Sequence, residues 1–440
     1  MPSHDAPGGE AALVRALTVR SLGASIVNTT VGAGIFVLPA AVATNLGAAA
    51  PLAYLTCAGA MALIVASFAM AGSRVSLTGG LYAYVEVAFG PYVGFLSGVL
   101  MWVGGVLSVA AVASAFAAQV AQLVPAAGTP VGRAALLLVV FATLALVNVR
   151  GVRHGARLVE SMTLAKLLPL LVFVAAGVVF VDRTALAWTG WPASSALGET
   201  VLLLIFAFLG VEVALVPSGE VKDPARTVPR ALFLALGATT LLYMGIQFVA
   251  QGVLGASLAS SAAAPLADAS SRFMGPFGRS LVLAGGIVSM FGYVTGDMLG
   301  SPRALFAFGR DGILPSAFAS VHQAFRTPHV AIGTHAVIVA TIAISGSFEA
   351  LAIIGNVAIL SLYLVCCLAA LELGRRDVRA GGTPFVVPGA RVVPVLASVA
   401  IVWILSHATW PEFAVTAAVL AVASGLYLVR RLRRSPAAPA

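Results

Sequence analysis

Long apolar stretches separated by short polar segments run along almost the whole chain, and none of the polar segments is long enough to form a domain. A transmembrane helix needs about 20 consecutive apolar residues, and the pattern contains twelve such stretches. Their expected ranges are 22–40, 50–71, 93–124, 133–149, 157–181, 198–216, 230–254, 279–308, 329–346, 349–372, 392–408 and 411–429. The pattern therefore predicts an all-α integral membrane protein with twelve transmembrane helices, whose function lies inside the helix bundle.

The first predicted helix contains residues that disfavour a helix. Gly32 and Gly34 each cost about 1 kcal/mol relative to alanine, and Pro39 removes a backbone donor. Broken backbone at membrane depth is tolerated where its unpaired groups face protein or a polar cavity. Free amides at a helix start suit a carboxylate, and free carbonyls suit an ammonium group or a cation. The alternative is a stripe of small residues that permits close helix packing.

A second interruption is predicted in the sixth helix, where Phe206-Ala-Phe-Leu-Gly-Val-Glu212 is followed by Pro217. It comes five helices after the first interruption. Corresponding interruptions in the two halves of a chain are typical of inverted-repeat transporters that bind substrate at the membrane midplane. The two halves show no convincing residue-by-residue similarity, so the repeat is inferred from this spacing alone.

Composition excludes a soluble globular domain. Of the 440 residues, 60% are hydrophobic and only 9% are charged, whereas soluble domains are about 25% charged. The net charge of +9 reflects orientation: with the N-terminus in the cytoplasm, twenty basic residues lie on the cytoplasmic side and four on the other. We therefore expect a multi-pass protein of the inner or plasma membrane with both termini cytoplasmic, no cleaved signal peptide and no nucleic-acid partner.

Few residues suggest metal or enzyme chemistry. Cys57, Cys366 and Cys367 lie in apolar stretches without metal-ligand spacing, so they are interpreted as packing residues. Neither a Ser/His/Asp set nor an HExxH motif is present, which argues against an enzyme. No metal and no other cofactor is expected.

Four motifs follow one another along the chain: VGAGIF, LTGGLYAYVEVAFGPYVGFLSG, FAFLGVE with SGEVKDPARTVPRA, and SPRALFAFGRDGILPSAFASVH. Together they resemble the amino acid–polyamine–organocation (APC) superfamily of amino acid transporters. The resemblance implies a LeuT-like core of five plus five helices in inverted repeats, with helices 1 and 6 broken, and two further C-terminal helices. The expected segments are a cytoplasmic N-terminus (1–20), a first repeat (21–181), a second repeat (196–372), the last two helices (391–429) and a basic cytoplasmic tail (430–440).

Carried over through these motifs, the resemblance implies that the amides of Ala33 and Gly34 hold a substrate carboxylate. It also implies that carbonyls of both broken helices hold the α-ammonium group, those of Thr30, Phe206, Ala207 and Leu209. Phe206 stands where the family has an aromatic gate, although a single Phe in an apolar span is usually a packing residue. The expected substrate-binding residues are Thr30, Gly32, Ala33, Gly34, Phe206, Ala207, Leu209 and Gly210.

Lys166 and Glu212 are charged residues within predicted helices, where a charge costs roughly 3 kcal/mol. The resemblance places Lys166 where sodium-coupled relatives of the fold bind sodium, which implies transport without sodium. A desolvated lysine can also load and release a proton, so proton coupling is expected, although obligate exchange would leave the same sequence. A lysine that snorkels to the membrane surface is the alternative. Glu212 either pairs with helix dipoles or is protonated during transport.

Asp297 is a candidate for the side-chain pocket, where an acid would favour a cationic substrate. One turn of rotation would instead place it against the cytoplasmic vestibule or Arg303. Of the six histidines, only His335 lies well inside a predicted helix, where a structural role is favoured over a proton relay.

These features predict a secondary active, sodium-independent amino acid transporter, coupled to protons, that works by alternating access around a midplane site. Its partners would be a small amino acid substrate, a proton and the lipid bilayer, and it would be a monomer or homodimer. One alternative is an exchanger of amino acids or amines, with cationic substrates bound through Asp297. Another is an amino acid sensor that does not transport, although the chain has no sizeable soluble tail for an effector. The substrate side chain is not predicted, because backbone motifs recognise only what all amino acids share.

Overall fold

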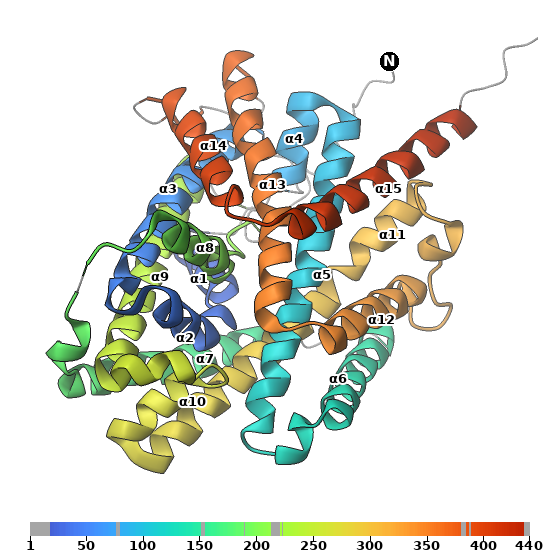
Figure 1. The fold of residues 1–440 in the computed structure, drawn as a ribbon. Coiled ribbons are helices and arrows are strands. Elements are labelled where there is room, and N and C mark those ends of the chain that lie inside the picture. Colours follow the sequence, from blue (N-terminus) through green and yellow to red (C-terminus); the bar gives the residue numbers. More distant parts are fainter. Residues whose placement is uncertain are drawn as a thin grey trace, which may run out of the picture.

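The computed structural model describes residues 18–75, 80–150, 155–188, 190–212, 221, 223–379, 384–386 and 389–434. The described part of the chain is a bundle of α-helices with short connections (Figure 1). The α-helices are α1 (Val19–Thr30), α2 (Gly34–Leu46), α3 (Ala50–Arg74), α4 (Leu81–Phe89), α5 (Pro91–Ala121), α6 (Pro130–Arg150), α7 (Gly155–Gly177), α8 (Ser194–Leu204), α9 (Pro224–Leu254), α10 (Pro265–Gly300), α11 (Pro302–Arg310), α12 (His329–Ser345), α13 (Phe348–Arg375), α14 (Val392–Leu405) and α15 (Trp410–Arg434).

Short 3₁₀ segments cap or connect these helices. They are η2 (Gly47–Ala49), η3 (Pro125–Gly128), η4 (Val178–Phe180), η5 (Arg183–Leu186), η6 (Ile205–Phe208), η9 (Gly255–Ser260) and η10 (Ser316–Ala319). The segment η6 matters most for the site, because it continues α8 into the second interruption.

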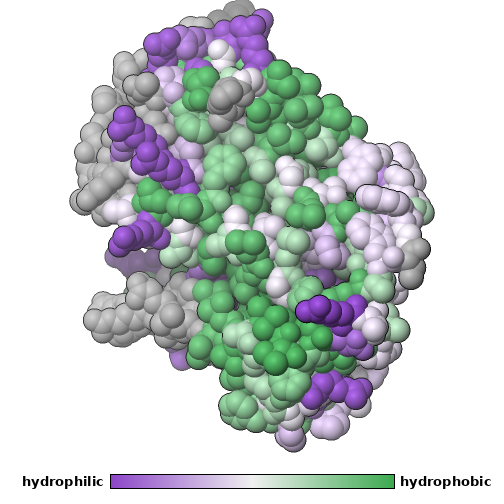
Figure 2. All heavy atoms as spheres, turned by 90° about the vertical axis from the view of Figure 1, so that its left-hand side faces the viewer, coloured by the Kyte–Doolittle hydropathy of each residue, from purple (hydrophilic) through white to green (hydrophobic). Residues whose placement is uncertain are grey.

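Several helical segments are long and apolar enough to cross a membrane. Within the described residues there are seven of them: Gly34–Arg74, Pro91–Ala121, Pro130–Arg150, Arg226–Ser260, Pro265–Arg310, Phe348–Arg375 and Trp410–Leu432. Four shorter apolar helices accompany them: Lys166–Phe180, Ser194–Phe208, His329–Ser345 and Val392–Leu405. Figure 2 shows a broad apolar surface on one face of the bundle, with hydrophilic residues mostly at its margins. These features are those of a multi-pass membrane protein.

The centre of the bundle is formed by α5 and α13, which run side by side (Figure 1). Their close approach depends on small residues. A Cβ added to Gly104 would lie 2.4 Å from Ile359 Cδ1, and one added to Gly355 would lie 3.3 Å from Leu107 Cβ. Small residues at such contacts let helix backbones approach closely, which is the main source of packing energy between helices in lipid.

The interruption expected in the first helix is confirmed. Helix α1 ends at Thr30 and α2 begins at Gly34, with the connecting residues outside any helix. The break lies at the glycines, while Pro39 lies inside α2. A proline can be accommodated in a membrane helix when neighbouring groups satisfy the carbonyls it disturbs. The Gln247 side chain donates to the carbonyl of Pro39 itself at 3.5 Å, whereas the carbonyl that loses its helical partner to the proline is that of Ile35.

The expected helix 279–308 lies within one apolar helical region, Pro265–Arg310. Helix α10 contains a kink at Gly275, whose φ of 62° is not helical, and this kink separates its first part from the part that holds the expected start at 279. The helix boundary at Pro302, where α11 starts, was not expected. Proline is well suited to the first turn of a helix, where its missing amide would have no intrahelical partner. Ser301 keeps helical angles (φ −62°, ψ −32°), so this boundary reflects the missing amide of Pro302.

The loop after α13 is fixed against the end of α3. Arg74 donates to the carboxylate of Asp377 at 3.3 Å and to the carbonyl of Val378 at 3.1 Å. Arg379 also donates to Asp377, at 2.9 Å. The hydrogen bond from Arg379, assisted by that from Arg74, holds the pKa of the Asp377 carboxyl below its usual value. The contact joins the end of α3 to the loop after α13, which lie about 300 residues apart in the chain.

Candidate functional site

The two interrupted segments lie against each other. In Figure 1, α1 and α2 lie beside α8 and α9. The hydroxyl of Thr29 donates to the carbonyl of Gly210 at 3.0 Å, which links the end of α1 to the residues that follow η6. On the other side of the break, a Cβ added to Gly34 would lie 3.0 Å from Ala207 Cα. Two motifs far apart in the sequence thus form one local site.

A side chain is poorly tolerated at Gly210 for two separate reasons. Its φ is +107°, a backbone conformation that glycine adopts readily and other residues rarely do. An added Cβ would also lie 2.7 Å from the carbonyl oxygen of Thr29. Both the turn and the contact between the two interruptions therefore require glycine here.

The start of α2 presents unpaired backbone donors. The first amides of any helix have no intrahelical partner, and none of the described residues accepts a hydrogen bond from the amides of Ala33 or Gly34. Both residues are buried. A buried pair of free amides at the positive end of a helix dipole is suited to a carboxylate.

Backbone carbonyls of both interruptions meet at Tyr243. The hydroxyl of this tyrosine on α9 lies 2.9 Å from the carbonyl oxygen of Thr30 and 2.9 Å from that of Ala207. A hydroxyl has one proton to donate, so Tyr243 can satisfy only one of these carbonyls fully at a time. The carbonyl of Thr30 also accepts from the amide of Gly32 at 2.8 Å. When Tyr243 donates to Ala207, the oxygen of Thr30 therefore keeps one lone pair for a different donor, such as an ammonium group.

A small cavity lies between these elements. It is lined by Thr29, Thr30, Gly32, Ala33, Gly34, Ser108, Val112, Phe206, Leu209 and Tyr293. Its volume accessible to water is about 20 Å³, enough for about one water molecule. Phe206 is 7% exposed and packs edge-on against Phe348, with ring centroids 5.3 Å apart. Any larger ligand therefore requires the cavity to widen.

The expected site residues are largely brought together. Of the eight predicted substrate-binding residues, six line the cavity: Thr30, Gly32, Ala33, Gly34, Phe206 and Leu209. Ala207 contacts Gly34 and Tyr243 behind the cavity wall, and Gly210 shapes the turn. The structure thus places these residues at one location.

Lys166 lies at the end of α1. Its ammonium group donates to the backbone carbonyl of Asn28, in the last turn of that helix, and the residue is 8% exposed. The last carbonyls of a helix lack intrahelical partners and carry the negative end of its dipole, so a cation is favourable there. Lys166 is therefore anchored to the first interruption.

Glu212 closes the turn at the second interruption. Its Oε2 accepts hydrogen bonds from the amide of Gly210 at 2.9 Å and from the hydroxyl of Tyr363 at 2.5 Å. The residue is 6% exposed. Glu212 therefore fixes residues 210–212 to α13, directly behind the cavity wall.

Asp297 does not line the cavity. Its carboxylate lies 2.8 Å from Nε2 of His335 and accepts a hydrogen bond from Ser301 at 2.5 Å. Arg303, which sequence analysis considered as a partner, donates instead to the carbonyl of Leu299. Asp297 lies one helical turn beyond Tyr293, which is the cavity residue on the same helix.

Sequence analysis missed the buried polar side chains that support the interruptions. Tyr243 and Gln247 lie one turn apart on α9, at 0% and 1% exposure. Asn356 on α13 is fully buried and donates to the carbonyl of Leu202 at 2.7 Å, near the end of α8. A single hydrogen-bonding residue in the middle of an apolar span could have indicated such a role, because a buried polar group needs a partner.

Metal ligands do not cluster at this site. Within the part of the chain that the structure describes, no group of three or more His, Cys, Asp or Glu side chains could hold a metal ion. The chemistry available at the cavity is that of backbone amides, backbone carbonyls and hydroxyl groups. Such groups can bind a zwitterion without forming a covalent bond to it.

Comparison with known proteins gives consistent matches. A family model described as amino acid permease matches residues 17–427. A methylthioribose transporter of Bacillus subtilis is 26% identical, over 94% of this chain and 94% of its own. A serine/threonine exchanger of Bacillus subtilis is 28% identical, over 70% of this chain and 71% of its own. An L-lysine transport protein of Corynebacterium glutamicum is 30% identical, over 72% of this chain and 65% of its own.

Proposed function

The chain belongs to the amino acid permease family, and from this premise we propose that it is a secondary active transporter of amino acids. The observation that carries the proposal is the pair of interrupted helices, which present free amides and shared carbonyls to one buried cavity. One relative is named as a serine/threonine exchanger and another as an L-lysine transport protein. Serine, threonine and lysine all carry the same carboxylate and α-ammonium groups. Backbone recognition of those shared groups would suit any amino acid.

In the proposed complex, the amides of Ala33 and Gly34 bind the substrate carboxylate. The α-ammonium group binds the carbonyl of Thr30, and Tyr243 then donates its proton to Ala207 instead. The carbonyls of Phe206 and Leu209 are further acceptors beside the cavity. Because no charged side chain lines the cavity among the described residues, the substrate can leave without separating a buried ion pair, which would be costly.

We propose twelve membrane spans for this fold. The spans would be α1 with α2, α3, α5, α6, α7, α8 with η6, α9, α10, α12, α13, α14 and α15, while α4 and α11 are short connecting helices. Residues 21–181 and 196–372 would form the two inverted repeats. Support comes from the interruptions in the first and sixth of these spans, which correspond if the repeats are inverted. The distribution of basic residues favours cytoplasmic termini in the cell membrane.

Transport is proposed to need no sodium. The ammonium group of Lys166 is fixed to the carbonyl of Asn28 and so places a positive group beside the first interruption while it is protonated. A second cation bound there would be repelled by it. Proton coupling through Lys166 or Glu212 is the form of energy input that we favour.

The second candidate is exchange of one amino acid for another, which the activity named for one relative supports. Binding of cationic substrates through Asp297 is disfavoured, because that carboxylate already has His335 and Ser301 as partners. A sensor without transport is a third candidate, in a different functional class.

Uptake into proteoliposomes tests the proposal. A panel of radiolabelled L-amino acids is offered with and without an inward proton gradient, with and without sodium, and with and without internal amino acid. Accumulation driven by the proton gradient alone is expected. Uptake only into preloaded vesicles would establish an exchanger, and binding without any uptake would overturn transport in favour of a sensor.

A further inference from the structure

A second buried polar cluster lies beside the cavity without lining it. Asp297 on α10 and His335 on α12 are joined by a contact of 2.8 Å between Oδ2 and Nε2. Ser301 donates to the other carboxylate oxygen at 2.5 Å. The side chain of His335 is 0% exposed and that of Asp297 is 10% exposed. A buried acid and base in contact can hold or release a proton together.

The cluster lies one helical turn from the cavity along two helices. On α10, Tyr293 lines the cavity four residues before Asp297. On α5, a Cβ added to Gly105 would lie 3.9 Å from Asp297 Oδ1, and Ser108, three residues further on, lines the cavity. A change of charge at Asp297 would therefore be felt at the cavity wall.

Other charged or titratable groups on the neighbouring helices have partners elsewhere. Arg303 on α11 donates to the carbonyl of Leu299, and Lys166 on α7 donates to that of Asn28. Arg133 on α6 donates to the carbonyls of Ala343 and Gly346, and Tyr363 on α13 donates to Glu212. Helix α5 contributes Trp102 and Gly105 to the cluster, neither of which titrates. On α12 itself, His329 lies six residues before His335. His335 is the one basic side chain in contact with Asp297 in the described part of the chain.

One unpaired atom, Nδ1 of His335, marks where a proton could be added. Nδ1 of His335 has no hydrogen-bond partner, and neither has Nε1 of Trp102, although the two rings are 6.2 Å apart. A neutral imidazole that donates from Nε2 to the carboxylate leaves Nδ1 as an acceptor. Adding a proton there makes an imidazolium that neutralises Asp297, but its new N–H needs an acceptor that Trp102 is unable to supply. Protonation is thus linked to a rearrangement between α5 and α12.

We propose that Asp297 and His335 form a proton-binding site that takes up one proton from water and releases it as the adjacent cavity opens and closes. On uptake an N–H bond forms at His335 Nδ1 as an O–H bond of a hydronium ion breaks and leaves water, and on release the N–H bond breaks as water takes the proton back. The inference rests on the proposed transport function. It adds a site on α10 and α12 to the residues of the two interruptions.

The test compares two transport assays on His335→Gln and Asp297→Asn in proteoliposomes, with a mixture of radiolabelled L-amino acids. One assay measures accumulation driven by an inward proton gradient. The other measures counterflow, the exchange of external label for internal unlabelled amino acid at equal pH. Both variants are expected to lose accumulation, down to the equilibrium level, and to retain counterflow. If His335→Gln does not fold, Asp297→Asn carries the test, because asparagine has nearly the same shape and can still accept from Ser301.

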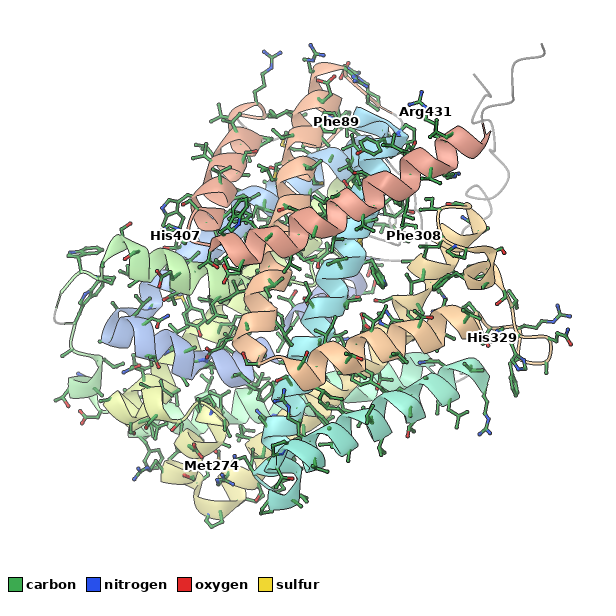
Figure 3. All side chains as sticks on the ribbon, turned by 45° about the vertical axis from the view of Figure 1, so that its right-hand side comes forward. Phe89, Met274, Phe308, His329, His407 and Arg431 are labelled. Atoms are coloured by element: carbon green, nitrogen blue, oxygen red, sulfur yellow. The ribbon has the colours of Figure 1, made fainter. Side chains whose placement is uncertain are left out.

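His329→Gln is the matched control, since it makes the same substitution on the same helix. His329 is the first residue of α12, and it lies well away from α1 and α2 (Figure 3). This variant should retain both accumulation and counterflow. Proton-driven accumulation in both cluster variants would overturn the proposal, and so would a wild-type protein that shows counterflow without any response to the proton gradient. Absence of both activities in the wild type would instead refute the transport function itself.

Discussion

Replacing Gly34 by valine tests the proposed carboxylate site most directly. A Cβ at this position would lie 3.0 Å from Ala207 Cα and 3.1 Å from Ala207 Cβ, closer than ordinary van der Waals contact. Valine adds two further methyl groups, so the two interrupted segments must move apart. The amides of Ala33 and Gly34 would then no longer point at one carboxylate.

The expected loss follows from those two hydrogen bonds. A hydrogen bond to a charged group contributes roughly 1.5–3 kcal/mol, so losing both costs about 3–6 kcal/mol of binding free energy. That corresponds to a rise in Kd of roughly a hundredfold to ten-thousandfold. Gly34→Ala should weaken binding less, because a single methyl group needs a shift of only a few tenths of an ångström. Removing a glycine from α2 also favours the helix, by up to about 1 kcal/mol, so weaker binding would not reflect a weaker helix.

Substrate binding to purified protein and uptake into proteoliposomes are the assays. Gly333→Val on α12 is the control, because a Cβ added there meets no atom within 4 Å. Both valine variants should insert and purify as a single species, and only Gly34→Val should lose binding. Unchanged uptake by Gly34→Val would refute the assignment of the carboxylate to the start of α2.

Three further outcomes are expected. Tyr243→Phe should lower stability by about 1–2 kcal/mol, because a buried carbonyl loses its donor, and substrate should raise its melting temperature more than that of the wild type; equal melting temperatures without substrate would contradict this. Lys166→Ala, which loses the contact with Asn28, should slow uptake about tenfold or more while changing substrate affinity less, as measured by parallel uptake and binding titrations. Because the pKa of Asp377 is held below its usual value of 3.8, its contacts with Arg379 and Arg74 stabilise the fold above that pH, and the stabilisation is lost as pH falls through the lowered pKa; thermal unfolding should therefore separate the wild type from Asp377→Asn at pH 7, and the difference should shrink as the pH is lowered below 3.8.

Local chemistry explains which parts of the fold could be predicted from the sequence. Glycines disfavour a helix wherever they occur, so the interruption between Thr30 and Gly34 follows from residues that are adjacent in the chain. Hydropathy likewise indicates most helices, because each must be apolar by itself to enter a membrane. The boundary between α10 and α11 was missed, since hydropathy does not register the missing amide of Pro302 within a long apolar region.

The partners of the site depend on how helices face one another, and that is why the sequence did not indicate them. Tyr243 and Asn356 are single polar residues in apolar spans, and their roles become evident only when α9 and α13 meet the interrupted helices. Asp297 illustrates the same limit. Sequence analysis could place its carboxylate in the pocket or one turn away, and the outcome depends on the rotation of α10, which brings it to His335.

The division of labour in this site has a physical reason. In the proposed complex, the groups that bind the carboxylate and the α-ammonium group are backbone atoms. Their positions depend on where the helices break, so a change of side chain disturbs them little. Ionisable side chains, in contrast, lie behind the wall: Lys166 on the end of α1, Glu212 on the second turn and Asp297 with His335. A charge in this second layer can alter the packing of the wall without binding the substrate directly. The wall residues Ser108, Val112 and Tyr293 lie outside the two interruptions, so their side chains can change without altering the backbone groups of the site.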